Sequence, residues 1–256
     1  MKPFFLWALV IGASTYAAIC ILLYFNQRNM IYLPTSETEA GGATAVRITS
    51  GDQSLKVWRI GNASKAIIYF GGNAENVAWN IPAFRDYFSN YSVYLLNYRG
   101  YGGSTGSPSE SGLYQDALAL YDYLKTQHKE FYVIGRSLGA AIGTYLASER
   151  EVEKLILVTP FDSALNMAKE LYPLFPVSLL LKDRYDSVRY AKNVSAKIGV
   201  IIAEQDGIVP RDRSDALIDA FSPSQISVEI IKNANHNSLD NFTDYSAALV
   251  AFVYTE

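Results

Sequence analysis

The 256-residue chain is poor in the residues that build metal centres and crosslinks. Its one cysteine, Cys20, excludes an internal disulfide and any metal site made of several cysteines. It also has only two histidines, His128 and His236. Any mechanism that depends on a histidine therefore has two candidates.

A strong charge of either sign is absent as well. The formal net charge is −3, and no block of lysines and arginines stands out. Nucleic-acid binding needs a basic face, so no nucleic-acid partner is expected. Half of the residues are hydrophobic, which is enough to bury the core of one domain beside an extra segment.

Near the N-terminus, the stretch Phe4–Phe25 contains no charged residue. As a helix it is about 33 Å long and matches a bilayer core of about 30 Å. A cleaved signal peptide has a shorter apolar region that ends in a small-x-small site, whereas "ICILLYF" follows the small residues here. Bulky Ile19 before Cys20 also disfavours a lipoprotein site. We therefore expect an uncleaved anchor over residues 1–28 and one domain over residues 29–256.

The charges that flank this apolar stretch are few. Lys2 precedes it and Arg28 follows it. With the terminal amine, this slight bias favours a cytoplasmic N-terminus and a main domain on the non-cytoplasmic side.

The remaining chain alternates short apolar runs with helical patterns. The pattern "LYQDALALYDYL" puts its apolar residues on one helical face, as does "FTDYSAALVAFVY". Such alternation predicts an α/β fold with a mainly parallel sheet flanked by helices. The first two or three strands lack helices between them and should form an antiparallel lead-in. The expected strands are "AVRI", "LKVWRI", "AIIYF", "SVYLLNY", "FYVIG", "KLILV", "IGVIIA" and "SVEII".

One interval, residues 161–195, breaks the strand–helix rhythm. Pro173 and Pro176 interrupt it, and the segment "LFPVSLLL" within it is markedly apolar. We expect a small cap insertion over the carboxyl edge of the sheet.

A G-x-S-x-G pattern surrounds Ser137 in "VIGRSLGAA". In a nucleophile elbow, the two glycines let a strand and a helix approach closely around a strained serine. The strand-like "EFYVIG" before it and the helix-like "LGAAIGTYLASE" after it supply the required context. The alternative is an ordinary strand–helix junction with a buried structural serine.

A serine hydroxyl needs a base, and the better histidine is His236. It lies in the polar "NANHNS", after the last expected strand, and catalytic groups collect at the carboxyl ends of parallel strands. His128 lies among charges in "KTQHKE" and is expected to be an exposed histidine at a helix end.

The acid that orients the histidine should follow a strand between the serine and the histidine. Asp206 in "IGVIIAEQDGIVP" meets this requirement and completes the order Ser, Asp, His of an α/β-hydrolase topology. Glu204, Asp162 and Asp183 remain as rivals.

An oxyanion hole would complete the apparatus. The backbone N–H of Leu138, directly after the serine, is one expected donor. The second should come from Gly71-Gly72-Asn73 after an early strand, with the N–H of Asn73 preferred to that of Gly72.

Taken in order, these segments resemble the motifs of the α/β-hydrolase-domain serine hydrolases. The similarity is greatest to a branch with an N-terminal anchor and a small cap, related to serine-aminopeptidase-like enzymes. It implies that Ser137 is the nucleophile, Asp206 the acid and His236 the base. It also implies that Asn73 and Leu138 donate to the oxyanion. The motifs are "FGGNAEN", "NYRGYGGSTGSPSE", "GRSLGAAI", "AEQDGIVP" and "NANHNS".

The chain departs from the family pattern at two places. The family usually has His-Gly-Asn where this chain has Gly71-Gly72-Asn73. It often has Asp-Tyr-Arg-Gly where this chain has "NYRG", residues 97–100. The first departure removes a histidine side chain that would hold the oxyanion loop, so a looser loop is expected.

The resulting hypothesis is acyl transfer to water without a metal or organic cofactor. The apolar cap and the anchor suggest a lipid or other hydrophobic acyl substrate, bound through an ester or thioester. A peptidase and a catalytically inactive, membrane-tethered binding protein remain as alternatives.

Overall fold

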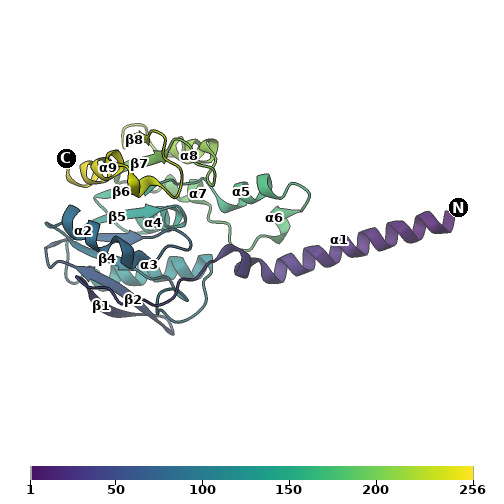
Figure 1. The fold of residues 1–256 in the computed structure, drawn as a ribbon, viewed down its shortest axis with the longest axis horizontal. Coiled ribbons are helices and arrows are strands. Elements are labelled where there is room, and N and C mark those ends of the chain that lie inside the picture. Colours follow the sequence, from purple (N-terminus) through teal and green to yellow (C-terminus); the bar gives the residue numbers. More distant parts are fainter. Residues whose placement is uncertain (1, 256) are drawn as a thin grey trace.

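A mixed β-sheet forms the body of the protein in a computed structural model that describes residues 2–255 (Figure 1). Within these residues the sheet has eight strands in the order β1-β2-β4-β3-β5-β6-β7-β8. Every expected apolar run forms one of them. The strands are β1 (Thr44–Ser50), β2 (Gln53–Ile60), β3 (Lys65–Phe70), β4 (Ser92–Leu96), β5 (Glu130–Arg136), β6 (Lys154–Val158), β7 (Lys197–Ala203) and β8 (Ile226–Ile231).

The antiparallel part of the sheet is limited to its first two strands. β1 pairs antiparallel with β2, and β2 pairs antiparallel with β4. β3 is parallel to both β4 and β5, so it does not belong to the antiparallel lead-in. The reason is the connection between β3 and β4, which contains helix α2 (Ile81–Tyr87). This connection returns the chain to the end of the sheet at which β3 began, so β4 runs parallel to β3. The fold class expected from the sequence is confirmed.

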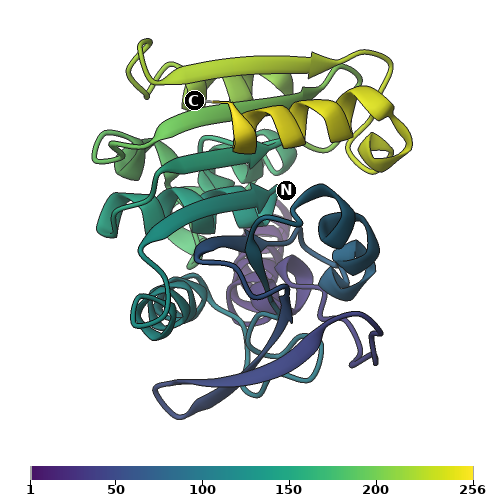
Figure 2. The ribbon, with the colours of Figure 1, turned by 90° about the vertical axis from the view of Figure 1, so that its left-hand side faces the viewer.

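Helices cover both faces of the sheet. Figure 2 shows α2 and α9 on the near face, where Phe84 and Leu249 pack on one apolar cluster. Leu120 of α3 and Ile142 of α4 belong to the cluster on the other face. The helices of the domain outside the insertion are η1 (Val77–Asn80), α2, α3 (Glu110–Leu124), α4 (Leu138–Glu149), α8 (Arg211–Ile218), η2 (Leu239–Asn241) and α9 (Thr243–Tyr254).

Between β6 and β7 the chain forms a helical insertion. It contains α5 (Ala164–Leu171), α6 (Val177–Leu180) and α7 (Ser187–Ala191). The buried carboxylate of Asp162 holds its base, because it accepts from Asn166 Nδ2 at 2.6 Å and from Arg213 Nη1 at 3.2 Å. We call the segment from α5 to α6 the insertion hairpin.

Helix α1 (Lys2–Ile31) projects from the domain as a long rod (Figure 1). Its stretch Pro3–Ile31 is long and apolar enough to cross a membrane, judged by length and composition. The half nearer the domain lies beside the insertion hairpin. There, the Tyr16 hydroxyl donates to Leu174 O at 2.9 Å, and Arg28 pairs with the buried Asp183 at 2.8 Å.

The contact between α4 and β3 leads to a stability prediction. A Cβ added at Gly139 would lie 2.0 Å from Phe70 O, whereas one added at Gly41 would meet nothing within 4 Å. We expect Gly139→Ala to lower the free energy of unfolding by about 1–3 kcal/mol or more, and Gly41→Ala to leave it nearly unchanged. Denaturant unfolding in detergent micelles measures both. Equal stabilities would mean that α4 can move off β3 without cost.

Candidate active site

Ser137 lies on a strained turn between β5 and α4. Its φ of 52° and ψ of −113° fall in a region that non-glycine residues rarely occupy. The two glycines of the motif make the turn possible, because a Cβ at Gly135 would lie 2.3 Å from Gly139 O. The two glycines of the motif thus allow β5 and α4 to approach closely, and the serine side chain lies at the carboxyl edge of the sheet.

The three side chains of the expected triad meet at this edge. His236 Nε2 lies 3.1 Å from Ser137 Oγ, and His236 Nδ1 lies 2.7 Å from Asp206 Oδ2. Ser137 follows β5, Asp206 follows β7 and His236 follows β8, so strands parallel to one another bring them together. A carboxylate on Nδ1 fixes the tautomer in which Nε2 can accept the serine proton.

Asp206 is held as a carboxylate. Its Oδ1 accepts from the backbone N–H groups of Ile208 and Val209 at 2.9 and 2.8 Å. Burial favours a higher pKa, but the hydrogen bonds from His236 and these two N–H groups outweigh it and lower the pKa of Asp206. The group is therefore charged at neutral pH and suited to stabilise an imidazolium.

The rival acids have other partners. Asp162 binds the base of the insertion, and Asp183 pairs with Arg28 of α1. Glu204 accepts from the backbone N–H of Asn233 at 2.8 Å. Asp206 is the carboxylate hydrogen-bonded to His236.

The expectation that His128 is exposed is wrong. Its side chain is buried, with Nε2 2.8 Å from the Tyr94 hydroxyl and Nδ1 3.0 Å from Ser64 O. The charged residues next to His128 in the sequence suggested exposure. Its hydrogen-bond partners come from β4 and from the turn before β3, which are distant in the chain, so nothing in the sequence pointed to them.

The loop after β3 lies beside the serine turn, since a Cβ at Gly72 would be 3.8 Å from Ser137 Cβ. The Gly72 N–H is already used, because it donates to Glu75 Oε2 at 2.7 Å. Among the hydrogen bonds of the described residues, none uses the N–H of Asn73 or of Leu138. Leu138 is the first residue of α4, where N–H groups have no partner within the helix.

Glu75 restrains this loop, in which Gly71 stands where the family usually has a histidine. Besides Gly72, its carboxylate accepts from the Tyr69 hydroxyl and from Asn80 Nδ2, both at 2.6 Å. The Tyr98 hydroxyl adds a hydrogen bond to Gly71 O at 2.7 Å. The expected loosening of the loop is therefore offset by groups that we did not single out from the sequence.

The side chain of Asn73 ties the same loop to the end of α1. Its Nδ2 donates to Ile31 O at 2.6 Å. Its Oδ1 accepts from Leu33 N at 3.0 Å and from the Tyr101 hydroxyl at 2.8 Å. The residue expected to donate a backbone N–H to an oxyanion is thus held by the segment that follows the apolar helix.

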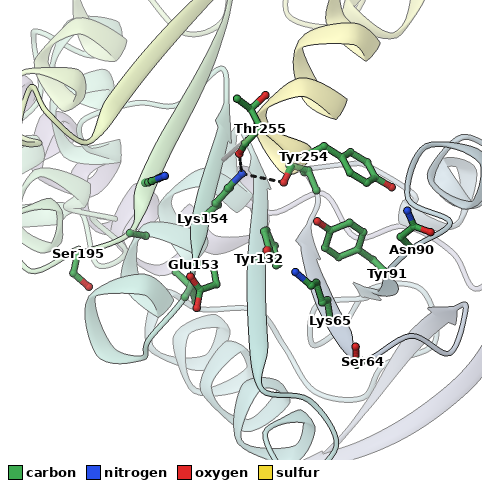
Figure 3. A pocket seen from close by; sticks show the side chains of 14 residues that line it. Ser64, Lys65, Asn90, Tyr91, Tyr132, Glu153, Lys154, Ser195, Tyr254 and Thr255 are labelled. Atoms are coloured by element: carbon green, nitrogen blue, oxygen red, sulfur yellow. Dashed lines mark hydrogen bonds between the residues drawn. The ribbon is translucent and has the colours of Figure 1, made fainter.

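A large cavity of about 670 Å³ lies at the opposite edge of the sheet (Figure 3). Lys65, Tyr132 and Lys154, from the amino-terminal halves of β3, β5 and β6, line it. Lys154 Nζ donates to Val253 O and to Thr255 O. Since none of the lining residues belongs to the serine, histidine or loop cluster, this cavity is separate from the candidate active site.

With the geometry described, comparison with known proteins identifies the family. The family model described as alpha/beta hydrolase fold matches residues 65–198. The uncharacterized protein Rv2307c of Mycobacterium tuberculosis is 31% identical over 243 residues, which cover 89% of this chain and 86% of that protein. The chain belongs to the α/β-hydrolase family and is a hydrolase.

Two further likenesses add detail. The lysophosphatidylserine lipase ABHD12 of Xenopus tropicalis is 32% identical over 185 residues, covering 62% of this chain and 47% of that protein. The Pyrococcus furiosus esterase Pf2001 superposes with a TM-score of 0.72 over 87% of this chain and 98% of that chain. At 18% identity, the second likeness establishes the fold alone.

The lowered pKa of Asp206 predicts a pH-dependent contribution to stability. Because the pKa of Asp206 is lower in the folded than in the unfolded state, its contribution is present above the unfolded value of about 3.8. It is lost as the pH falls through the folded value. Relative to Asp206→Asn, the wild type should lose stability as the pH is lowered from about 6 to 3. Urea unfolding of both proteins across this range measures the difference, and a constant difference would contradict the prediction.

Proposed function

We propose that the protein is a serine hydrolase that cleaves the ester or thioester bond of a hydrophobic acyl substrate. One observation carries the proposal: the hydrogen-bonded chain from Ser137 through His236 to Asp206 at the carboxyl edge of the sheet. Its supports are the strained backbone of Ser137 and the family membership.

In the proposed reaction, Ser137 Oγ attacks the acyl carbon as His236 Nε2 takes the hydroxyl proton. The imidazolium then gives this proton to the departing alcohol or thiol, leaving an acyl group on Ser137. Water attacks the acyl carbon while His236 takes a proton from it. Collapse of the second tetrahedral intermediate releases the acid and returns the proton to Ser137. Asp206 stays ionised throughout and stabilises the imidazolium.

The proposed oxyanion donors are the N–H groups of Asn73 and Leu138. Both lie on segments that adjoin Ser137, and neither N–H has another partner among the described residues. Each such donor is typically worth about 3 kcal/mol in the transition state. Gly72 is not proposed as a donor, because Glu75 already accepts its N–H.

We also propose that residues 1–28 anchor the protein and that residues 29–256 form a hydrolase domain, with the insertion over residues 161–195 as its cap. The length and apolar composition of Pro3–Ile31 support the anchor. The weak charge bias of its flanks supports a domain on the non-cytoplasmic side. The likeness to a lysophosphatidylserine lipase supports a lipid as the acyl substrate.

Active-site labelling tests the proposal directly. A fluorophosphonate probe should label the wild type but not Ser137→Ala, and His236→Ala should be labelled far more slowly. Ser137→Ala should also lower kcat for an ester by at least about 10⁴-fold, since the triad acts as a unit.

The control is Ser246→Ala on α9, whose hydroxyl donates to Thr243 O in a solvent-exposed hydrogen bond. It should label like the wild type. A folded wild-type protein that takes no label would favour the alternative of a non-catalytic binding protein. Cleavage of aminoacyl amides in preference to esters and thioesters would favour the peptidase.

Glu75 should act as a positioning residue for the oxyanion loop. In Glu75→Gln, an NH₂ group replaces one of the two carboxylate oxygens, each of which accepts a hydrogen bond from Gly72 N–H or from the Tyr69 hydroxyl. The NH₂ group then faces a donor instead of accepting from it, so the turn at Gly72 should be held less firmly. We expect kcat to fall about ten- to hundred-fold with KM nearly unchanged, because misplacing the oxyanion donors affects the transition state selectively. Steady-state kinetics measure the split, with exposed Glu229→Gln as the control. A rise in KM alone would contradict the role.

A further inference from the structure

A second, apolar pocket lies between α1 and the insertion hairpin. Its volume is about 150 Å³. The pocket is open at the surface, and a predominantly apolar lining of this kind suits an apolar ligand segment. Its walls include Leu23, Met30 and Ile31 from α1 and Ala168, Tyr172 and Leu180 from the insertion hairpin.

The side-chain amide of Gln27 lies in the wall of this pocket and already has hydrogen-bond partners. Gln27 Nε2 donates to Leu180 O at 2.9 Å, and Gln27 Oε1 accepts from the backbone N–H of Lys182 at 2.7 Å. These bonds fasten α1 to the insertion. With a further bond from Nε2 to Tyr24 O at 2.9 Å, they use both N–H groups of the side-chain amide and one acceptor site of its oxygen. The pocket therefore suits a hydrocarbon segment rather than a polar headgroup.

One wall of this pocket is hydrogen-bonded to the loop beside the candidate active site. Ile31 lines the pocket, and its carbonyl oxygen accepts from Asn73 Nδ2 at 2.6 Å. Asn73 belongs to the loop beside Ser137, so the pocket begins one residue contact away from the proposed oxyanion hole.

The end of α1 near the domain carries side chains typical of a membrane interface. Lys182 Nζ lies 4.0 Å from the centre of the Tyr24 ring, and Arg28 pairs with Asp183. Tyr16 lies about 12 Å further along α1 from Tyr24, towards the bilayer centre. Because its hydroxyl donates to Leu174 O, the tip of the insertion hairpin lies at that depth beside α1 (Figure 1).

The outer surface of the insertion hairpin fits such a depth. Leu171, Leu174 and Leu179 are 70%, 82% and 81% exposed. Exposed apolar side chains clustered beside a membrane-spanning helix mark a surface that contacts lipid. The pocket between hairpin and helix would then open where lipid acyl chains are present.

We propose that the pocket between α1 and the insertion hairpin binds the acyl chain of a lipid substrate that enters from the leaflet next to the domain. This inference rests on the proposed function and adds that α1 is part of the substrate site as well as an anchor. Chain-length preference is then set jointly by α1 and the hairpin.

Two substitutions in the hairpin test the inference on the full-length protein in phosphatidylcholine nanodiscs. Ala168→Phe fills the pocket, whereas Leu179→Phe changes an exposed side chain of the same hairpin. We expect the wild type to prefer a dodecanoyl to an acetyl p-nitrophenyl ester. Ala168→Phe should lower the ratio of their kcat/KM values at least about ten-fold, and Leu179→Phe should leave it within about two-fold.

A direct binding measurement covers the case in which Ala168→Phe does not fold. A diazirine-bearing fatty acid, photolysed with wild-type protein in the same nanodiscs, should crosslink to peptides containing Leu23–Ile31 and Ala168–Leu181. Crosslinks confined to the rest of α1, or an unchanged chain-length ratio in folded Ala168→Phe, would overturn the inference. Hydrolysis of both esters would in that case still support the proposed function, whereas a folded wild type that cleaves neither ester would contradict the proposed function.

Discussion

The close approach of α4 to the end of β3 is the constraint on which the rest of the site depends. Only a glycine at 139 lets the backbone of the helix lie against Phe70 O, and the serine turn beside this contact has a strained conformation. The same contact places the start of α4 beside the loop that follows β3. The proposed nucleophile and the proposed oxyanion donors are thus positioned by backbone packing, before any side-chain interaction between them.

Side chains from distant segments then complete the arrangement. Glu75 supplies to the oxyanion loop the restraint that a histidine would give elsewhere in the family, and the end of α1 holds Asn73. As a result, the last residue of the apolar helix, Ile31, is hydrogen-bonded to the loop beside Ser137. A membrane anchor joined by a flexible linker would not have this property, because its position would be independent of the loop.

The sequence predicted the eight strands and the class of the fold because each strand carries an apolar run, which burial imposes on the inner strands β2 to β7. The elbow was predictable for a similar reason, since its glycines act within a few residues of Ser137. The environments of His128 and Asn73 were not predictable. Their partners, such as Ser64 and Ile31, are distant in the chain, and a single sequence carries no signal for which loops meet. The sequence also left undecided whether β3 runs parallel or antiparallel to its neighbours, because its apolar pattern did not reveal the helix between β3 and β4.

The central claim is that acyl transfer passes through Ser137. Peptide mass spectrometry of protein quenched within the first turnover of an ester tests it most directly. The account predicts an added acyl mass on the peptide that contains Ser137, which disappears as the ester is exhausted. Turnover with no acyl mass at Ser137, or with the acyl group on another residue, would contradict the account.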